Sequence, residues 1–480
     1  MSLKKRTISG LFWTFSQQFS VQFINFFIQI VLARVLLPSD FGLIAMMTVF
    51  MNVGTSLVDA GLTSSLIRTE SPDQRDYSTV FFVNLLGSVV IYLLLFIAAP
   101  YISNFYNEVR LESIIKVYTL TFIIRAFVGV QTTKLTKEMN FKLQMTMQIP
   151  SVVIGGLVGV FLAYKGFGVW SIVWMNLVQS TLFTAQHWFS TGWYPSFVFD
   201  LERLKYHFFF GYKLTISGLL DTIYKNIYTL IIGKYFSITE LGFYNRANSL
   251  RMFPVQNIST ALNKVTYPLF SSIQNDDKKL KLAYMKLMQQ VLFWITPLLV
   301  FLACVAEPFF RLLLTEKWLP AVPYFQLLCI SGIMFPLHSY NLNILKVKGR
   351  TDLFLKLELI KKFYTTIGIV CCVPFGIYAL LYYQIISTVL SFYVNSFYSG
   401  KLLNYKMKEQ IKDIAPILFS GSISGLVLYL LNLFCIKSLY LPDFAFLLVT
   451  ALLYSGIYIL ISRLLKIDAL SDFKQLILKR

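Results

Sequence analysis

Long apolar runs follow one another along the whole chain, separated by short polar segments. Each run holds about 18 or more predominantly apolar residues, enough for a helix to cross the ~30 Å hydrocarbon layer of a bilayer. None shows the alternating pattern of a transmembrane β-strand. The pattern predicts an all-α integral membrane protein with about 14 transmembrane helices, at residues 11–33, 41–62, 79–102, 114–133, 143–164, 167–189, 211–233, 243–270, 287–314, 322–345, 359–378, 380–400, 413–434 and 443–463.

Lys and Arg residues gather in every second connecting segment. With the N-terminus in the cytoplasm, 30 of the 43 Lys and Arg residues fall in segments on the cytoplasmic side, and about ten fall on the other side. Short loops rich in Lys and Arg mark the cytoplasmic side of membrane proteins. The bias therefore predicts that both termini are cytoplasmic. The first run is too long for a signal peptide and has no small-residue cleavage site, so we expect it to be retained.

A faint internal repeat relates the beginning of the chain to residues about 200 positions later. Ala33-Arg34 and Ser39-Asp40-Phe41-Gly42 align with Gly233-Lys234 and Thr239-Glu240-Leu241-Gly242. In each copy an apolar run ends in a basic residue, and a Ser/Thr-acidic pair then caps the next helix. The match predicts two halves that are related by duplication.

Six spans per copy return the chain to the side of the membrane where it started. The two halves are therefore expected to be parallel repeats, related by an axis along the membrane normal. We expect an N-terminal six-helix lobe at residues 1–207, a C-terminal six-helix lobe at 208–403 and an additional two-helix segment at 404–480. The polar stretch 195–205 is the expected linker between the lobes, and the tail 464–480 alternates apolar and charged residues like a helix on a membrane surface.

Composition agrees with a membrane protein. The chain is 56% hydrophobic, only 14% of its residues are charged, and its mean hydropathy is +0.64. Its five Cys residues all lie in apolar runs without C-x-x-C spacing, and its three His residues have no partners at the spacing of metal ligands. We therefore expect no metal site and no cofactor.

The sequence favours transport over catalysis. The predicted outer loops are only about a dozen residues long and carry few charges, whereas enzymes that transfer lipid-linked sugars need acid–base groups outside the membrane. The chain also lacks the Walker A, H-E-x-x-H and G-x-S-x-G motifs. We expect that the protein is not an enzyme.

Ionisable residues inside predicted spans are the candidate site. Such a residue costs at least ~2.5–3.5 kcal/mol on insertion scales, so it usually faces a cavity or a partner. Five of the seven candidates are basic, which favours an anionic substrate such as a phosphate or diphosphate on a lipid carrier. The predicted anion cavity contains Arg125, Lys225, Arg246, Arg251 and Lys264, and the candidates for ion coupling are Asp59 and Asp221.

Structural roles for these residues stay open at this point. Arg246 and Arg251 lie near the outer end of a span and could extend to lipid headgroups. Asp221 and Lys225 are four residues apart on one helical face and could simply neutralise each other.

Four motifs make the chain resemble a known family: LARVLLPSDFGLIAM (32–46), LGFYNRA (241–247), VTYPLFSSIQND (265–276) and EKWLPA (316–321). Together they resemble the polysaccharide transporter family, the Wzx-type flippases of the multidrug/oligosaccharidyl-lipid/polysaccharide exporter superfamily. The resemblance covers nearly the whole chain. It implies two six-helix lobes around a central cavity, a C-terminal helix pair and the export of undecaprenyl-diphosphate-linked oligosaccharide across a bacterial inner membrane.

The expected partners follow from this resemblance. They are the lipid-linked oligosaccharide, membrane lipids and a polysaccharide polymerase, with no nucleic acid among them. Three alternative functions remain: a cation-coupled multidrug extruder, a peptidoglycan-precursor flippase of the same superfamily, and a lipid-linked sugar polymerase or ligase. The extruder should carry more acidic than basic residues in its spans, opposite to the pattern here, and the polymerase or ligase lacks its outer loop.

Overall fold

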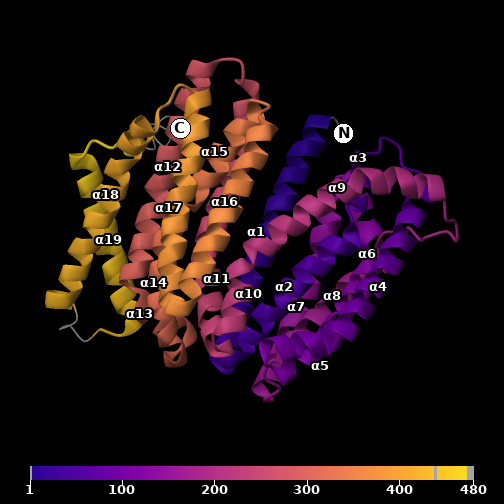
Figure 1. Cartoon of the computed structure of the whole chain (residues 1–480). Coiled ribbons are helices and arrows are strands. Elements are labelled where there is room, and N and C mark those ends of the chain that lie inside the picture. Colours follow the sequence, from indigo (N-terminus) through magenta and orange to yellow (C-terminus); the bar gives the residue numbers. More distant parts are fainter. Residues whose placement is uncertain (1–2, 437–440, 473–480) are drawn as a thin grey trace. The chain divides into compact units, whose positions relative to one another are not determined.

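The computed structural model describes the backbone of residues 3–436 and 441–472. The side chains of residues 3–11, 213, 214, 261–265, 267, 435 and 436 lie outside this description. Every regular element in the described residues is a helix (Figure 1). The predicted all-α class is therefore confirmed.

Contacts divide the chain into two compact units, Met1–Gly242 and Phe243–Arg480. Unit 1 contains α1 (Leu3–Val35), α2 (Pro38–Asp59), α3 (Leu62–Arg68), α4 (Gln74–Tyr106), α5 (Val109–Tyr118), α6 (Leu120–Lys137), α7 (Phe141–Tyr164), α8 (Trp170–Ser190), α9 (Leu201–Lys225) and α10 (Ile227–Tyr235). This division does not test the predicted lobe boundary between residues 207 and 208, which stays a prediction.

Unit 2 begins inside α11 (Ile238–Ser272), whose first turn belongs to unit 1. It continues with α12 (Asp277–Cys304), α13 (Ala306–Leu314), η1 (Glu316–Ala321), α14 (Val322–Ile333), α15 (Phe335–Val347), α16 (Thr351–Cys372), η2 (Val373–Phe375), α17 (Ile377–Leu402), α18 (Met407–Leu431), η3 (Asn432–Ile436) and α19 (Asp443–Leu464). The predicted surface tail at 464–480 falls outside the described residues from residue 473 onward.

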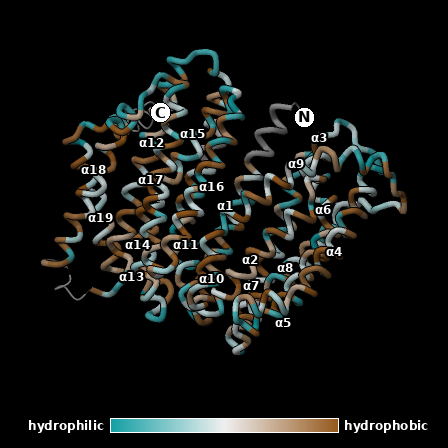
Figure 2. Tube along the Cα trace, viewed as in Figure 1, coloured by the Kyte–Doolittle hydropathy of each residue, from teal (hydrophilic) through white to brown (hydrophobic). Residues whose placement is uncertain are grey.

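Ten helical stretches in the described residues are long and apolar enough to cross a membrane. Figure 2 shows hydrophobic residues along the lengths of the helices and hydrophilic residues gathered near helix ends. The protein is therefore a multi-pass membrane protein. The predicted spans at 167–189, 211–233, 243–270 and 359–378 are not among these ten stretches, so the number fourteen stays a prediction.

Several predicted spans are two consecutive helices in the structure. Proline accounts for two of these breaks, because Pro308 and Pro336 each lie in the first turn of the second helix, where the missing backbone N–H does no harm. The helices meet at Thr119 (α5 and α6), Asn226 (α9 and α10), Val305 (α12 and α13) and Met334 (α14 and α15).

The two copies of the repeat make equivalent contacts where α2 and α11 begin. The Asp40 carboxylate accepts a hydrogen bond from the backbone N–H of Leu37 at 3.1 Å. The Glu240 carboxylate accepts one from the backbone N–H of Ser237 at 3.0 Å. These two caps are separated by 200 positions in the chain, like the aligned sequence motifs.

The same two helix starts cross each other at a pair of glycines. A Cβ atom on Gly42 would lie 2.1 Å from the carbonyl oxygen of Ile238. A Cβ atom on Gly242 would lie 1.9 Å from the carbonyl oxygen of Pro38. The contact is reciprocal at the aligned positions, and only glycine lets the two backbones approach so closely.

A buried polar network joins α3, α4 and α9 at one end of unit 1. Asp76 of α4 is fully buried, and its Oδ1 lies 3.2 Å from NH1 of Arg203 and 3.3 Å from Nε2 of His207. The other ring nitrogen of His207, Nδ1, lies 2.8 Å from Oγ of Ser65. A neutral imidazole satisfies both contacts, since it donates from Nε2 to Asp76 and accepts the Ser65 hydroxyl at Nδ1.

The predicted linker is bound to α4. The backbone N–H of Ser196 donates to Oγ of Ser78 at 3.0 Å, and the backbone N–H of Asp200 donates to Oγ1 of Thr79 at 3.1 Å. Asp200 then caps α9 by accepting hydrogen bonds from the backbone N–H groups of residues 202 and 203. The linker and the buried network together fix where α9 begins.

Candidate functional site

A polar pocket lies in unit 1 and is lined by residues of α2, α6 and α9. Its volume is about 480 Å³. Three of the predicted site residues, Asp59, Arg125 and Lys225, lie in its wall. The complete lining is Asn52, Thr55, Ser56, Asp59, Arg125, Thr222, Lys225 and Asn226.

One face of α2 supplies half of this lining. Asn52, Thr55, Ser56 and Asp59 follow one another at intervals of three, one and three residues, which places them on one side of an α-helix. The Thr55 hydroxyl donates to the carbonyl of residue 51 at 2.8 Å, and the Ser56 hydroxyl donates to the carbonyl of Asn52 at 3.0 Å. Both hydroxyl protons are therefore used within the helix.

Asp59 is the last residue of α2 and is held by the next helix. Ala60 and Gly61 adopt left-handed backbone conformations, with φ of 43° and 70°, and end α2 there. Oδ1 of Asp59 then accepts hydrogen bonds from the Thr63 hydroxyl at 2.6 Å and from the Thr63 backbone N–H at 3.3 Å. Both bonds go to the same oxygen, which leaves Oδ2 as an acceptor.

Arg125 of α6 lines the same pocket as Asp59. Its Nε donates to Oγ of Ser180 in α8 at 3.2 Å, which fixes the direction of the guanidinium. Among the described side chains, no carboxylate lies within ion-pair distance of Arg125. A cation without an acidic partner in a predicted span is the type of group that a bound anion stabilises.

The end of α9 adds a second cation, Lys225, to the pocket lining. Nζ of Lys225 lies 2.7 Å from the Asp221 carboxylate one turn earlier, and the two side chains are 74% and 49% exposed. The amide of Asn226 donates from Nδ2 to the carbonyl of Thr222 at 2.8 Å. The predicted pairing of Asp221 and Lys225 is therefore present. An exposed pair of this kind holds Lys225 only weakly.

A close helix crossing brings α9 to this position. A Cβ atom on Gly211 would lie 2.2 Å from the carbonyl oxygen of Ala60, at the break between α2 and α3. Glycine at this point allows α9 to touch the end of α2. The next turns of α9 then carry Thr222 and Lys225 to the pocket.

Arg246 and Arg251 lie elsewhere, buried in unit 2. The guanidinium of Arg246 lies 5.6 Å from the ring centre of Trp318. Arg251 donates from NH1 to Oγ of Ser331 at 2.8 Å and from NH2 to the Asn248 side chain at 2.7 Å. Each side chain is 6% exposed, which argues against the alternative that they extend to lipid headgroups. Their role in anion binding stays a prediction.

The structure thus brings together three predicted residues and adds five that sequence reasoning missed. The Lys264 side chain lies outside the described residues. The missed residues are Asn52, Thr55, Ser56, Thr222 and Asn226. The signal that could have identified four of them was their spacing, since they lie within one or two turns of Asp59 or Lys225 on the same helices.

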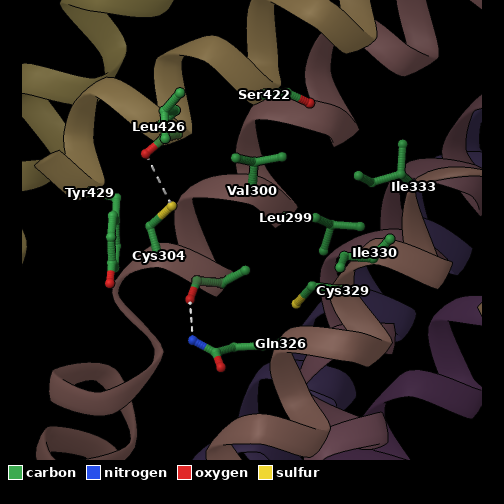
Figure 3. Close-up of a pocket in the computed structure, with 12 residues that line it drawn as sticks. Leu299, Val300, Cys304, Gln326, Cys329, Ile330, Ile333, Ser422, Leu426 and Tyr429 are labelled. Atoms are coloured by element: carbon green, nitrogen blue, oxygen red, sulfur yellow. Dashed lines mark hydrogen bonds between the residues drawn. The ribbon is translucent and has the colours of Figure 1, made fainter. Parts of the chain in front are cut away.

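A second pocket, in unit 2, is almost entirely apolar. Its volume is about 400 Å³, and it lies among α12, α14 and α18 (Figure 3). Gln326 is one of its few polar lining residues, and its amide donates to the carbonyl of Ala303 at 3.0 Å. Cys304 and Cys329 also line it, as small side chains of the helix bundle. None of the predicted site residues lines this pocket.

The all-helical fold with its ten long apolar helical stretches defines a multi-pass membrane protein, and a charged polar pocket lies among α2, α6 and α9 of unit 1. Residues 31–323, more than half of the chain, match the profile of the family described as "Polysaccharide biosynthesis protein". The chain therefore belongs to this family of polysaccharide biosynthesis proteins. The resemblance predicted from the sequence motifs is confirmed.

Individual relatives agree with this assignment, and a solved structure has a similar fold. The chain is 26% identical to the lipopolysaccharide biosynthesis protein WzxC of Escherichia coli (strain K12), over 82% of each chain. It is 28% identical to the teichuronic acid biosynthesis protein TuaB of Bacillus subtilis (strain 168), over 64% of this chain and 63% of that one. In fold it is similar to the lipid II flippase MurJ in an inward closed conformation, with a TM-score of 0.76, 14% identity and coverage of 96% and 100% of the two chains.

Proposed function

We propose that this transporter is a flippase for oligosaccharide repeat units linked to undecaprenyl diphosphate. It moves them from the cytoplasmic to the outer face of a bacterial inner membrane by alternating access, with both of its termini in the cytoplasm. The observation that carries the proposal is the pocket of unit 1, which is lined by Arg125 and Lys225 together with hydroxyl and amide side chains.

The diphosphate is the part of such a substrate that fits the two cations. A guanidinium forms short, charge-assisted hydrogen bonds with phosphate oxygens, and an ammonium adds a second point of attraction. Arg125 is held by Ser180 through Nε, so its terminal nitrogens are the ones available to a ligand. Lys225 can exchange the Asp221 carboxylate for a phosphate because the pair is exposed.

The membrane potential assists this direction of transport. When no charge of the protein moves with the substrate, an interior-negative potential favours outward movement of a dianion by about 4.6 kcal/mol per 100 mV, from about 2.3 kcal/mol per charge. We propose Asp59 and Asp221 as the groups that bind a coupling cation, so that a cation gradient also drives outward transport. The glycan occupies the aqueous pocket, while the prenyl chain stays in lipid.

The remaining basic residues have a less direct place in the proposal. Arg251 contacts a side chain of α14 and Arg246 contacts a side chain of η1, both within unit 2. Together with Lys264, these residues are proposed as part of the path of the anion. A polysaccharide polymerase on the outer face would consume the exported repeat units and is the proposed protein partner.

The two alternative transport functions differ in what they require of the pocket. A multidrug extruder for cations should present more acidic than basic groups, whereas this pocket is lined by two basic residues and one acidic residue. A peptidoglycan-precursor flippase would need the same diphosphate chemistry. It is distinguished by its effect on the cell, since loss of that function is lethal whereas loss of a surface-polysaccharide flippase is expected to be tolerated.

The test is the Arg125→Gln variant, expressed in a strain that lacks the wild-type gene. Loss of charge-assisted hydrogen bonds to the diphosphate should lower export about 10-fold to 100-fold at unchanged protein level. Surface polysaccharide and membrane-bound protein are measured together. The control is Arg110→Gln, because Arg110 is an exposed arginine outside the pocket. Export by Arg125→Gln at the level of the control would show that Arg125 does not bind the substrate.

A further inference from the structure

Large aromatic side chains are exposed along residues 189–209, the segment that joins α8 to α9 and includes the start of α9. Phe189, near the end of α8, is 88% exposed, and Phe197 in the linker is 99% exposed. Tyr194, Phe199 and Phe209 are each more than half exposed. Several exposed aromatic side chains in one short segment indicate a surface that binds a partner or a membrane.

The backbone of this segment is fixed against α4. The Gln74 amide donates from Nε2 to the carbonyl of Tyr194 at 2.7 Å, and its Oε1 accepts the indole N–H of Trp193 at 2.7 Å. Trp193 is buried, and its ring contacts Tyr77 and Phe81 of α4 at centroid distances of 6.0 Å and 6.1 Å. Two hydroxyl groups of α4 bind the linker farther along. The segment is therefore a fixed part of unit 1 that holds its exposed aromatic side chains at the surface.

Phe197 lies beside the apolar part of α4. Its ring centre is 6.0 Å from that of Phe82, and the two rings are stacked with an interplanar angle of 28°. Phe82 is the ninth residue of α4, so it lies about 12 Å along the helix from Gln74, at about 1.5 Å per residue. The apolar run V-F-F-V at 80–83 has begun there, and α4 is one of the stretches long and apolar enough to cross a membrane. Phe197 is therefore at the depth where α4 enters the hydrocarbon layer.

This position favours the bilayer over water or another protein as the surrounding of the linker. Water is an unfavourable surrounding for an apolar ring that is almost fully exposed. The exposed surface continues from α4, which a membrane surrounds in any case. Aromatic side chains are enriched where a membrane meets water. Lys205, exposed near the start of α9, is the type of long basic side chain that reaches lipid headgroups from such a position.

We infer that the aromatic side chains of residues 189–209 insert into the membrane interface beside α4, so that the linker and the start of α9 are bound to the bilayer (Figure 1). The partner is the lipid of the leaflet into which α4 begins. The linker then moves with unit 1 and the membrane, and does not act as a free tether in water. This inference goes beyond the proposed function and does not depend on which substrate is transported.

The experiment is photo-crosslinking from the linker in native membranes. The photoreactive amino acid p-benzoylphenylalanine is incorporated in place of Phe197 in the full chain, and membranes are irradiated before purification. The replacement needs no space in the core, because Phe197 is almost fully exposed. Mass spectrometry of the intact protein then measures the fraction of chains that carry the added mass of a phospholipid. We expect phospholipid adducts to predominate over protein adducts.

Ser71 provides the matched control. It is exposed in the segment between α3 and α4, just before α4 begins, and lies outside the apolar run. The probe at position 197 should give about tenfold or more lipid adduct than the probe at position 71, because burial of an aromatic side chain favours its place in lipid by a factor of that size. A second probe, at Phe199, should give lipid adduct like the probe at Phe197.

The results distinguish the bilayer from other surroundings. Lipid adduct at position 197 no more abundant than at position 71 would overturn the inference, since the linker would then lie in water. Adducts with a second copy or another protein in place of lipid would also overturn it, because the aromatic side chains would then form a protein interface. Export of polysaccharide is measured separately, so neither result bears on the proposed function.

Discussion

Single charged residues were visible in the sequence because charge is rare in a membrane span. Arg125 and Asp59 were identified in this way, and the structure places both in one pocket. Thr55 and Asn226 were not identified, because hydroxyl and amide side chains often bond to their own helix and cost little there. They belong to the site because tertiary packing places them beside α6 and α9. The apolar pattern of the sequence does not specify that packing.

His207 shows that the members of a buried polar network are equally hard to predict from the sequence. No partner for His207 could be predicted from the sequence, since Asp76 and Ser65 are 131 and 142 positions away. In the structure it is fully buried between them. Burial lowers the pKa of His207 and outweighs the opposing effect of the Asp76 carboxylate, while Arg203 adds to the lowering.

This lowered pKa predicts a loss of stability in acid. Between the folded pKa and the ordinary value of about 6.5, the unfolded chain binds a proton that the folded chain does not, so the free energy of unfolding falls as the pH decreases. One group contributes at most ~1.4 kcal/mol per pH unit. The thermal midpoint of the purified protein should therefore fall from pH 7.5 to 5.5, and the fall should be smaller in His207→Gln. Equal falls in the two proteins would show that His207 does not titrate on unfolding.

At the scale of helices, the sequence predicted where apolar segments lie better than where helices break. In the predicted span at 114–133, no proline or glycine lies next to Thr119, yet α5 ends and α6 begins there. The break at Met334 has a local cause in Pro336, which the apolar pattern concealed. The repeat motifs at residues 39–42 and 239–242, in contrast, correspond to equivalent caps because capping is a local property.

The glycine crossing of α2 and α11 gives a prediction at this scale. Gly42→Ala and Gly242→Ala should each lower the free energy of unfolding by about 1–3 kcal/mol, because the added methyl group overlaps a backbone carbonyl that cannot turn away. Thermal unfolding in detergent measures the effect. Gly87→Ala is the matched control, since a Cβ atom at this position in α4 meets only the carbonyl oxygen of Val58, at 4.0 Å. The control should be as stable as the wild type or slightly more stable, because alanine favours a helix. Equal midpoints in all three variants would mean that the crossing tolerates a side chain.

At the scale of the whole molecule, composition and hydropathy were sufficient to predict a multi-pass helical membrane protein. The family match agrees with the polysaccharide family that the motifs indicated, and the fold is all-helical as predicted. The division into compact units Met1–Gly242 and Phe243–Arg480 could not be derived in this way, because the apolar pattern does not record which helices touch. Transport of a lipid-linked glycan is the proposal that unites the basic pocket with this family.

The most direct test of this central proposal is the lipid composition of a strain in which the gene is deleted. Lipid extracts are analysed by mass spectrometry for diphosphate-linked oligosaccharide, and surface polysaccharide is stained in the same cells. We predict that complete repeat units accumulate on the lipid carrier while the surface polysaccharide is lost, and that expression of the wild-type chain reverses both changes. Normal surface polysaccharide without accumulated repeat units would contradict the flippase assignment.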